Sequence, residues 1–291
     1  MKPDRKVFDA HFHIGSSATR QFAERTITPI LDCDDHQSGA DIERYIERHG
    51  LGGGVMIPTY LEDQTAAFRY NDIILEAVRP ERSLYGALWV SPLPENEERT
   101  AAVLDRLPQP GIRALKMASN TWKEHTVDPS SWSPDLRSNL ERILSTAADC
   151  GLVIHFHTGY HTSADPLQFD AFLSEYGTTA TYQLAHMGEA IAPAFRFVPR
   201  FIEWIEKGYD VFTDTSVVPG FAPRWLIQQL EERGHPVDRV LFATDTPWGR
   251  FPAEYWKVEG LEVDAEIKTK IFWDNAAALY EERAKRLFEV P

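Results

Sequence analysis

The sequence predicts an α/β chain folded as a (β/α)8 barrel, the TIM barrel, in a single domain over residues 1–291. Short apolar runs alternate with amphipathic stretches along the whole chain, as expected when parallel strands alternate with helices. Histidines and one aspartate stand where several of the apolar runs end. The carboxyl ends of barrel strands meet on one face, where active sites are built, so we expect these side chains to meet there.

Eight apolar runs are predicted as strands, because they are continuous rather than alternating and therefore suit strands that are covered on both faces. In chain order they are residues 7–13, 53–58, 83–90, 111–117, 152–157, 181–186, 210–214 and 240–244. The length of 291 residues suits one such barrel. No internal repeat, low-complexity tract or Gly/Ser-rich linker divides the chain, which is why we expect one domain.

Helices are predicted between the strands. Residues 41–49 place Ile42, Tyr45, Ile46 and His49 at helical spacing, and Gly50 follows as a C-cap. Residues 136–150 repeat this spacing. The remaining predicted helices are residues 64–78, 97–107, 168–176, 199–207, 223–233 and 265–283.

Long connections are expected on the face where the strands end. Residues 14–40 and 118–134 are predicted as loops, of a length typical of binding loops and lids. The stretch that follows the last strand, residues 247–261, contains Trp248, Arg250, Phe251, Tyr255 and Trp256. It suits either a wall that faces the substrate or packing that is shielded from solvent.

The charge balance excludes some classes of partner. Lys and Arg number 30 and Asp and Glu number 44, which gives a formal net charge of −14. A protein that binds nucleic acid or an anionic membrane without sequence preference needs a basic face, so we expect neither partner. An anionic small-molecule substrate stays open, because one cation or metal ion can dominate a pocket.

The two cysteines, Cys33 and Cys150, are far apart and show no CxxC spacing, so we expect two reduced thiols. The first residues contain no apolar stretch of signal-peptide length, and no segment approaches the roughly 20 apolar residues of a membrane span. These observations predict a cytoplasmic protein.

The first predicted strand ends in His11-Phe12-His13. Strand side chains alternate between two faces, so this spacing places both imidazoles on the same side, where they could bind one ion. His155-Phe156-His157 repeats the spacing on the fifth strand. His157 is nearer to the following loop, so it is the preferred ligand, and His155 is expected to be a hydrogen-bonded core residue.

Three further residues are candidates for the same site. His186 ends the sixth strand and either ligates a metal, hydrogen-bonds a reacting group or is structural. Asp245 follows the last strand, where a buried carboxylate is costly unless paired or metal-bound; the alternative is a helix N-cap before Pro247. Lys116 stands in an apolar strand and forms an ion pair, binds an anionic substrate group, or is carboxylated and bridges two metals.

Four segments fall in order at the predicted strand ends: Asp9-Ala10-His11-Phe12-His13, His157-Thr158-Gly159, Leu184-Ala185-His186-Met187-Gly188 and Phe242-Ala243-Thr244-Asp245-Thr246-Pro247-Trp248. Trp273-Asp274-Asn275-Ala276-Ala277 follows near the end of the chain. Together these segments resemble the amidohydrolase superfamily, and specifically its branch called amidohydrolase 2. The resemblance extends from the first strand to the last helix.

This resemblance implies a metal-dependent barrel enzyme in which His11, His13, His157 and Asp245 are metal ligands. His186 would be a second-site ligand or a group that polarises the substrate. Zinc is the first metal expected, one or two ions per chain, with manganese, cobalt or iron as alternatives. The branch contains hydrolases of amides and lactones, hydratases, and nonoxidative decarboxylases of aromatic or unsaturated acids. Some of those decarboxylases replace one histidine of the first pair by glutamate, so the intact pair favours hydrolysis.

The leading hypothesis is therefore a metal-dependent hydrolase of a small carbonyl compound. A metal-bound hydroxide, available because the metal lowers the pKa of water to roughly 7, attacks the carbonyl. Asp245 transfers the proton and His186 stabilises the oxyanion. The alternative is a decarboxylase of an aromatic or dienoic acid, and a third reading is a barrel that binds without catalysing.

Candidates for contact with the substrate follow from position alone: Trp122, His125, Tyr160, His161, Trp248 and Arg250. The aromatic side chains suit a planar or apolar substrate, and Arg250 suits a carboxylate. Aromatic loops of this kind would also suit a homodimer.

Overall fold

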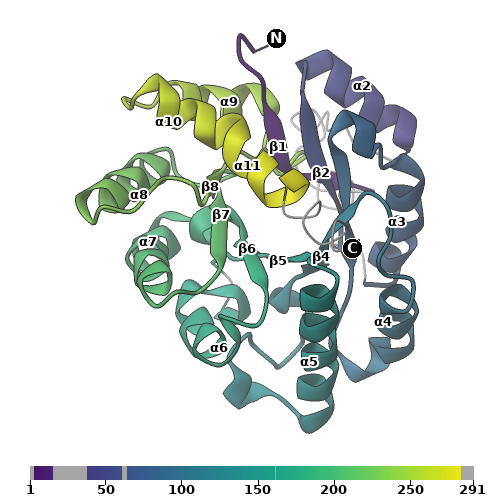
Figure 1. Ribbon diagram of the computed structural model, residues 1–291. Coiled ribbons are helices and arrows are strands. Elements are labelled where there is room, and N and C mark those ends of the chain that lie inside the picture. The colour runs from purple at the N-terminus through teal and green to yellow at the C-terminus, as the bar shows by residue number, and fades with distance from the viewer. Residues whose placement is uncertain (1–2, 16–37, 61–63, 161, 283–291) are drawn as a thin grey trace, which may run out of the picture.

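The computed structural model describes residues 3–15, 38–60, 64–160 and 162–282. Parallel strands form one eight-stranded sheet in sequence order, with helices around its outside, which confirms the predicted (β/α)8 barrel (Figure 1). The strands are β1 (Phe8–Ile14), β2 (Gly53–Pro58), β3 (Leu84–Trp89), β4 (Ile112–Met117), β5 (Val153–Phe156), β6 (Thr181–Leu184), β7 (Val211–Asp214) and β8 (Val240–Leu241).

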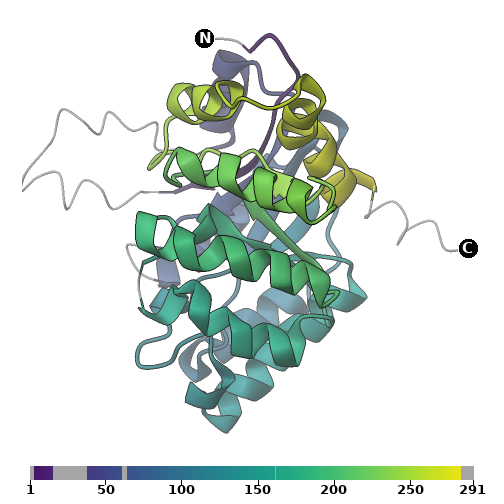
Figure 2. The same cartoon turned by 90° about the vertical axis from the view of Figure 1, so that its left-hand side faces the viewer.

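The helices after the first seven strands are α2 (Gly39–His49), α3 (Gln64–Ala77), α4 (Glu97–Leu104), α5 (Pro134–Asp149), α6 (Phe169–Tyr176), α7 (Ile191–Glu206) and α8 (Phe221–Glu232). Those after β8 are α9 (Phe251–Glu259), α10 (Ala265–Thr269) and α11 (Asn275–Ala277), with π-helical turns at Lys270–Asp274 and Ala278–Glu282. Figure 2, turned by 90°, shows α7 and α8 running across the outside of the strands.

Two helices differ from the prediction. The helix expected at residues 199–207 begins at Ile191, and Pro199 lies inside it. An apolar face that includes Phe197 and Phe201 is buried against the barrel and holds the longer helix together. Helix α9 occupies much of the stretch 247–261, where Phe251 and Tyr255 are buried, which agrees with the packing alternative for these two side chains.

The ring is closed by backbone hydrogen bonds between β1 and the segment after β8. The amide of Ala10 donates to the carbonyl of Phe242 over 2.9 Å, the amide of Asp245 to His11 over 2.7 Å, and the amide of His13 to Thr246 over 2.8 Å. Strand β8 itself is only two residues long, shorter than the predicted 240–244. These bonds continue the barrel wall beyond it and place Asp245 beside the histidines of β1.

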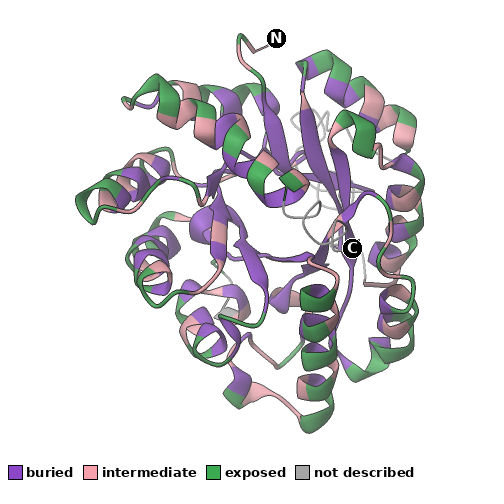
Figure 3. Ribbon diagram, in the orientation of Figure 1, coloured by how far each residue is buried: buried purple, intermediate pink, exposed green. Residues whose placement is uncertain are grey.

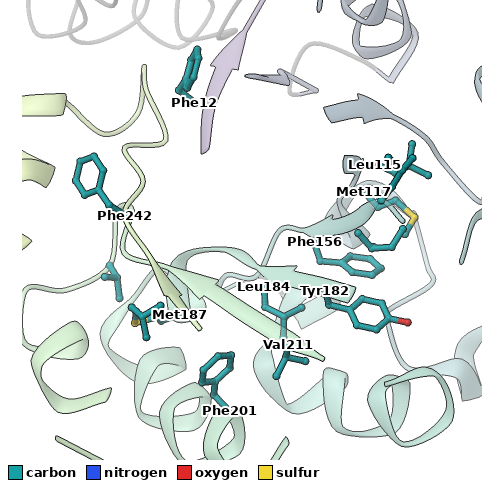
Figure 4. Close-up of a cluster of buried hydrophobic side chains, with 14 of the residues drawn as sticks. Phe12, Leu115, Met117, Phe156, Tyr182, Leu184, Met187, Phe201, Val211 and Phe242 are labelled. Carbon is teal, nitrogen blue, oxygen red and sulfur yellow. The ribbon is translucent and has the colours of Figure 1, made fainter. Parts of the chain in front are cut away.

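Side chains on the outer faces of the strands pack against the helices. Figure 3 shows the strands almost entirely buried, with Arg113 of β4 and Phe212 of β7 intermediate, whereas the helices are buried on one side and exposed on the other. Leu184 and Val211 belong to this layer together with Phe201 of α7 (Figure 4). A second buried cluster lies inside the barrel and contains Phe8, Tyr85, Val153 and Tyr280.

The end of the described chain packs against the amino-terminal ends of the strands. The ring of Tyr280 stacks on Phe8 with centroids 6.0 Å apart, and Asn275 donates to the carbonyls of Val237 and Val240 over 2.6 and 2.8 Å. Figure 1 shows this yellow segment crossing in front of the barrel. No helix among the described residues is long and apolar enough to cross a membrane.

Candidate metal centre

His11 and His13 lie on the inner face of β1 and are both buried. Phe12, between them, points to the opposite face, where its ring lies 5.3 Å from that of Tyr45. The Nε2 atoms of the two histidines are 3.0 Å apart. The alternation of side chains along a strand therefore brings two imidazole nitrogens to one point, as the spacing predicted.

Asp245 completes this group from the segment after β8. Its Oδ1 lies 2.9 Å from His13 Nε2 and 3.1 Å from His11 Nε2. Its backbone is left-handed, with φ of 55°, and its carbonyl accepts from the amides of Trp248 and Gly249. The side chain thus faces the histidines, while the main chain forms the turn.

The outer nitrogen of each histidine faces an acceptor. His13 Nδ1 lies 3.3 Å from the carbonyl oxygen of Pro58, which can only accept, so the hydrogen is on Nδ1. His11 Nδ1 lies 3.4 Å from Asp214 Oδ2. In these tautomers both Nε2 atoms present lone pairs to each other and to the Asp245 carboxylate.

This arrangement fits a metal cation. Ligand atoms at about 2.1 Å from one ion and at right angles to each other are about 3.0 Å apart. The three contacts among His11, His13 and Asp245 measure 2.9 to 3.1 Å. Three lone pairs that face one another without a hydrogen repel, and a divalent cation between them removes that repulsion. Two histidines and a carboxylate are a common catalytic donor set.

His186 lies next to this group. Its ring centroid is 4.9 Å from that of His11 and 5.1 Å from that of His157. It adopts a left-handed conformation with φ of 67°, and its Nδ1 lies 2.9 Å from Ser216 Oγ. His11, His186 and Asp214 form a second group whose donor atoms lie within 4.8 Å of one another.

His157 lies at the edge of the centre, beside Glu189. Its Nε2 is 3.9 Å from Glu189 Oε2, and a Cβ on Gly159 would lie 2.5 Å from that oxygen. Burial and the charge of Asp245 raise the pKa of Glu189 to about 7. The glycine therefore leaves room for a carboxyl group that can hold a proton near neutral pH. The ligand role of His157 stays a prediction.

Lys116 is fully buried and lies beside His155. Its Nζ is 2.9 Å from His155 Nδ1, which must accept because an ammonium has only donors. Burial lowers the pKa of Lys116 to about 7, although Asp245 and Asp214 act to raise it. His155 is thus a hydrogen-bonded interior residue, as expected.

Burial keeps His13, His155, His157 and His186 neutral near pH 7, which is the form that binds metal, whereas His11 is held more basic by two carboxylates. Burial lowers the pKa of His13 and of His186 to about 4, and lowers the pKa values of His155 and His157 well below 6.5. Burial also disfavours charge on His11, but Asp245 and Asp214 outweigh it and raise the pKa of His11. For Asp245, burial raises the pKa, yet His186 and His11 hold it well below its usual range.

The residues predicted to contact substrate are scattered. Trp248 is half-buried and meets His13 edge-on at 4.7 Å, whereas Tyr160 and Arg250 are exposed. Trp122 is buried against Phe156 in the layer between strands and helices. His125 bonds the carbonyl of Ser131. His161 lies outside the described residues, as do Cys33 and most of the loop predicted at 14–40.

Three carboxylates of this centre, Asp9, Asp214 and Glu189, were not predicted from the sequence. Asp9 is fully buried and accepts from Tyr45 Oη over 2.9 Å and from Thr244 Oγ1 over 2.7 Å, which joins α2 and the segment after β8 to β1. Asp214 ends a predicted strand, so the rule that identified Asp245 could also have found it. No comparable signal marks Glu189.

The family model described as amidohydrolase matches residues 47–281. The match includes His157, His186 and Asp245 and begins after β1. No curated protein matched the chain in sequence. Solved structures show the same fold at low sequence identity.

A 2,6-dihydroxybenzoate decarboxylase from Rhizobium has a TM-score of 0.66 and 14% identity, over 96% of this chain and 99% of that one. A dihydroxybenzoic acid decarboxylase from a Polaromonas species, with bound manganese and 2-nitroresorcinol, has a TM-score of 0.66 and 15% identity, over 95% and 97%. A probable 2-pyrone-4,6-dicarboxylic acid hydrolase from Acinetobacter baumannii, with citric acid bound, has a TM-score of 0.62 and 12% identity, over 95% and 99%.

Proposed function

We propose that this chain, which belongs to the amidohydrolase family in its amidohydrolase-2 branch, is a metal-dependent hydrolase of a small carbonyl compound such as an amide or a lactone. One observation carries the proposal. The Nε2 atoms of His11 and His13 and the Oδ1 atom of Asp245 converge within 3.1 Å of one another at the catalytic end of the barrel.

His11, His13 and Asp245 would hold the metal, with His157 and His186 as neighbouring ligands. A divalent cation supplies Lewis acidity, which lowers the pKa of water and polarises a carbonyl or carboxylate oxygen. Zinc is the first candidate for this nitrogen and oxygen donor set. Manganese is the second, because the Polaromonas decarboxylase contains it.

Asp245 is the proposed proton acceptor. It is ionised at neutral pH, and it lies at the point where the donor atoms converge, so it can take a proton from the attacking water. His186 presents an unprotonated Nε2 when Nδ1 donates to Ser216. That tautomer favours a ligand role for His186 over the oxyanion-stabilising role, which needs a hydrogen on Nε2.

Decarboxylation of an aromatic acid is the second candidate, and Glu189 favours it. Loss of carbon dioxide leaves a carbon that must take up a proton. Glu189 is a half-buried carboxyl group with a pKa raised to about 7, so it can hold that proton beside His157. Two of the solved structures above are decarboxylases of hydroxylated benzoic acids. The Trp248 indole at the edge of the centre suits a planar ring.

Elemental analysis of the purified protein and of the His11→Ala variant tests the metal centre. We expect about one ion per chain in the wild type and its loss in the variant. His49→Ala is the matched control, because His49 is also buried but its ring packs against Phe251 and Tyr45 rather than against the candidate ligands. Two ions per chain would add Lys116 and His186 as ligands. Metal in neither protein would contradict the proposal and favour a barrel that binds without catalysing.

Product analysis separates the two reactions. In water labelled with oxygen-18, hydrolysis of a lactone or amide places the label in the new carboxylate, whereas decarboxylation releases carbon dioxide and leaves the aromatic product unlabelled.

Mass spectrometry of the intact protein at neutral pH, compared with Lys116→Arg, shows whether Lys116 carries an added carbon dioxide.

Assembly and location are part of the same proposal. We expect a homodimer in the cytoplasm that acts on a small molecule. Light scattering of the purified protein gives the oligomeric state, and cell fractionation gives the compartment.

Arg250 and Tyr160 stay candidates for substrate contact, because both are exposed in segments that follow barrel strands.

A further inference from the structure

We infer that Asp214, at the carboxyl end of β7, is a positioning residue that fixes the orientation and the tautomers of both His11 and His186. Asp214 is itself held in place by Gln183, which is bonded to Tyr280 at the opposite end of the barrel. The inference rests on the proposed metal centre, because its purpose is to present two Nε2 lone pairs to one ion.

Asp214 is fully buried and is surrounded by donors. Its Oδ1 accepts from the Ser216 amide over 3.1 Å, from Ser216 Oγ over 2.5 Å and from the His186 amide over 3.3 Å. Its Oδ2 accepts from Gln183 Nε2 over 2.8 Å and faces His11 Nδ1 at 3.4 Å. One carboxylate thus reaches histidines on two strands, β1 and the end of β6.

The hydrogens on this network determine the tautomer of His186. The hydroxyl of Ser216 has one hydrogen and gives it to Asp214. Ser216 Oγ must therefore accept at its other contact, the 2.9 Å approach of His186 Nδ1. The hydrogen of the neutral imidazole is then on Nδ1, which leaves the lone pair on Nε2.

The same carboxylate acts directly on His11. Nδ1 of His11 makes no hydrogen bond of good geometry with any described residue, and the atom it faces is Asp214 Oδ2 at 3.4 Å, which can only accept. A carboxylate behind a ligating histidine fixes the ring and raises its basicity as a ligand. Asp214 thus controls His11 directly and His186 through Ser216.

Gln183 and Tyr280 determine which way Asp214 faces. Tyr280 Oη donates to Gln183 Oε1, which leaves the Gln183 amide nitrogen to donate to Asp214. Gln183 is fully buried on β6, and the Tyr280 ring stacks on Phe8 at the amino-terminal end of β1. A continuous chain of hydrogen bonds therefore runs through the barrel from Tyr280 to the metal centre.

Asp214 could instead be a direct ligand with His11 and His186, since donor atoms of the three lie within 4.8 Å. The contacts oppose this role. Three donors already converge on Oδ1 and the Gln183 amide on Oδ2, and these four hydrogen bonds use the roughly four lone-pair sites of a carboxylate. His11 would also have to bind through Nδ1, although its Nε2 faces His13 and Asp245.

The test compares Asp214→Asn and Tyr280→Phe with the control Tyr182→Phe. Tyr182 is a buried tyrosine on the same strand as Gln183, but its Oη donates to the Tyr176 carbonyl in the outer layer. Holoenzyme loaded with Mn²⁺ is titrated with a chelator and the retained metal is measured. We expect Asp214→Asn to weaken Mn²⁺ binding by about 10- to 100-fold, Tyr280→Phe to weaken it less, and Tyr182→Phe to leave it unchanged.

Unchanged Mn²⁺ affinity in Asp214→Asn, or equal affinities in Tyr280→Phe and Tyr182→Phe, would overturn the inference. A fall from two ions to one in Asp214→Asn, with the remaining ion bound as tightly, would make Asp214 a ligand and also overturn it. Melting temperatures identify a variant that fails to fold.

A second measurement does not depend on metal. Long-range ¹⁵N–¹H spectra of metal-free protein with labelled histidine report the tautomers when they are recorded at a pH above the raised pKa of His11. We expect the hydrogen on Nδ1 of His11 and His186 in the wild type and mixed tautomers in Asp214→Asn. Hydrogens on Nε2 in the wild type would overturn the inference. A wild type that binds no Mn²⁺ but shows the expected tautomers would instead contradict the proposed function alone.

Discussion

Asp245 has a backbone conformation that a residue with a side chain adopts at a local free-energy cost, with φ of 55°. Hydrogen bonds hold it there, because its amide donates to His11 and its carbonyl accepts from Trp248. The conformation aims the carboxylate at His11 and His13 instead of continuing the strand. The turn at Asp245 therefore accounts both for the backbone strain and for the position of the carboxylate in the candidate metal centre.

Asp245→Asn is expected to lower the turnover number by at least about 100-fold, because an amide cannot take the proton from water. The side chains have the same shape, so the barrel should still fold, with a lower melting temperature because the charge that His186 and His11 stabilise is lost. Steady-state kinetics and calorimetry measure the two effects. Turnover near the wild-type value would remove Asp245 from the mechanism.

Asp214 should make the protein sensitive to acid. Burial raises its pKa, but His11, His186 and Ser216 outweigh burial and hold the pKa well below its unfolded value of about 4. A carboxyl group with a depressed pKa stabilises the fold above the unfolded pKa, and this contribution is lost as the pH falls. In urea titrations with chelator present, the advantage of wild type over Asp214→Asn should therefore shrink between about pH 5 and pH 3. A constant difference would contradict this assignment.

At the scale of residues, the sequence predicted that the candidate histidines lie close together, but it did not predict the carboxylates that contact them. The alternation of strand side chains is sufficient to place His11 and His13 on one face. The contacts of Asp214 depend on Gln183, Ser216 and His11, which lie on different elements, and no spacing within one element encodes them. Glu189 depends on a left-handed backbone after Gly188, for which the sequence gives no periodic signal.

At the scale of elements, the connection after β8 holds Asp245 through close packing at Gly249. A Cβ at Gly249 would lie 1.9 Å from the carbonyl oxygen of Thr244, the residue that precedes Asp245. The sequence predicted neither this contact nor helix α9, because the aromatic residues of the stretch suited a binding wall equally well. The bounds of most strands were predicted to within a few residues, because strands that are buried on both faces have continuous apolar sequences.

Gly249→Ala is therefore expected to displace the turn that carries Asp245, with loss of metal and a fall of about 1–3 kcal/mol in the free energy of unfolding. The matched control is Gly220→Ala before α8, where no described heavy atom lies within 4 Å of the added Cβ. Metal content and urea titrations compare the two variants. Equal metal content in both would show that the Thr244 carbonyl can move aside without cost.

At the scale of the whole molecule, one end of the barrel is covered by the last helical segment and the other contains the candidate metal centre. Asn275 ties the last helical segment to Val237 and Val240, at the amino-terminal end of β8. The metal centre lies beyond the carboxyl end of that strand. The order of apolar and amphipathic stretches was sufficient to predict the barrel. It could not predict that the last segment packs over the amino-terminal ends of the strands, because that packing depends on contacts between residues far apart in the sequence.

Asn275→Ala should lower the free energy of unfolding by about 2–3 kcal/mol, because two buried carbonyls lose a donor. Metal affinity and the turnover number at 25 °C should stay near the wild-type values, because Tyr280 keeps its own contacts with Phe8 and Gln183. Urea titration and steady-state kinetics test both parts. A large loss of metal would show that Asn275 is also needed to position Tyr280.

The hydrogen bonds that join β1 to the segment after β8 can form only late in the synthesis of the chain. His13 and Asp245 are 232 residues apart in the chain, so a ribosome finishes nearly the whole barrel before the second of them is made. A nascent chain carries the His11–His13 pair early but without its carboxylate partner. If these residues bind the ion as proposed, tight binding would follow closure of the ring, because the carboxylate ligand is made last.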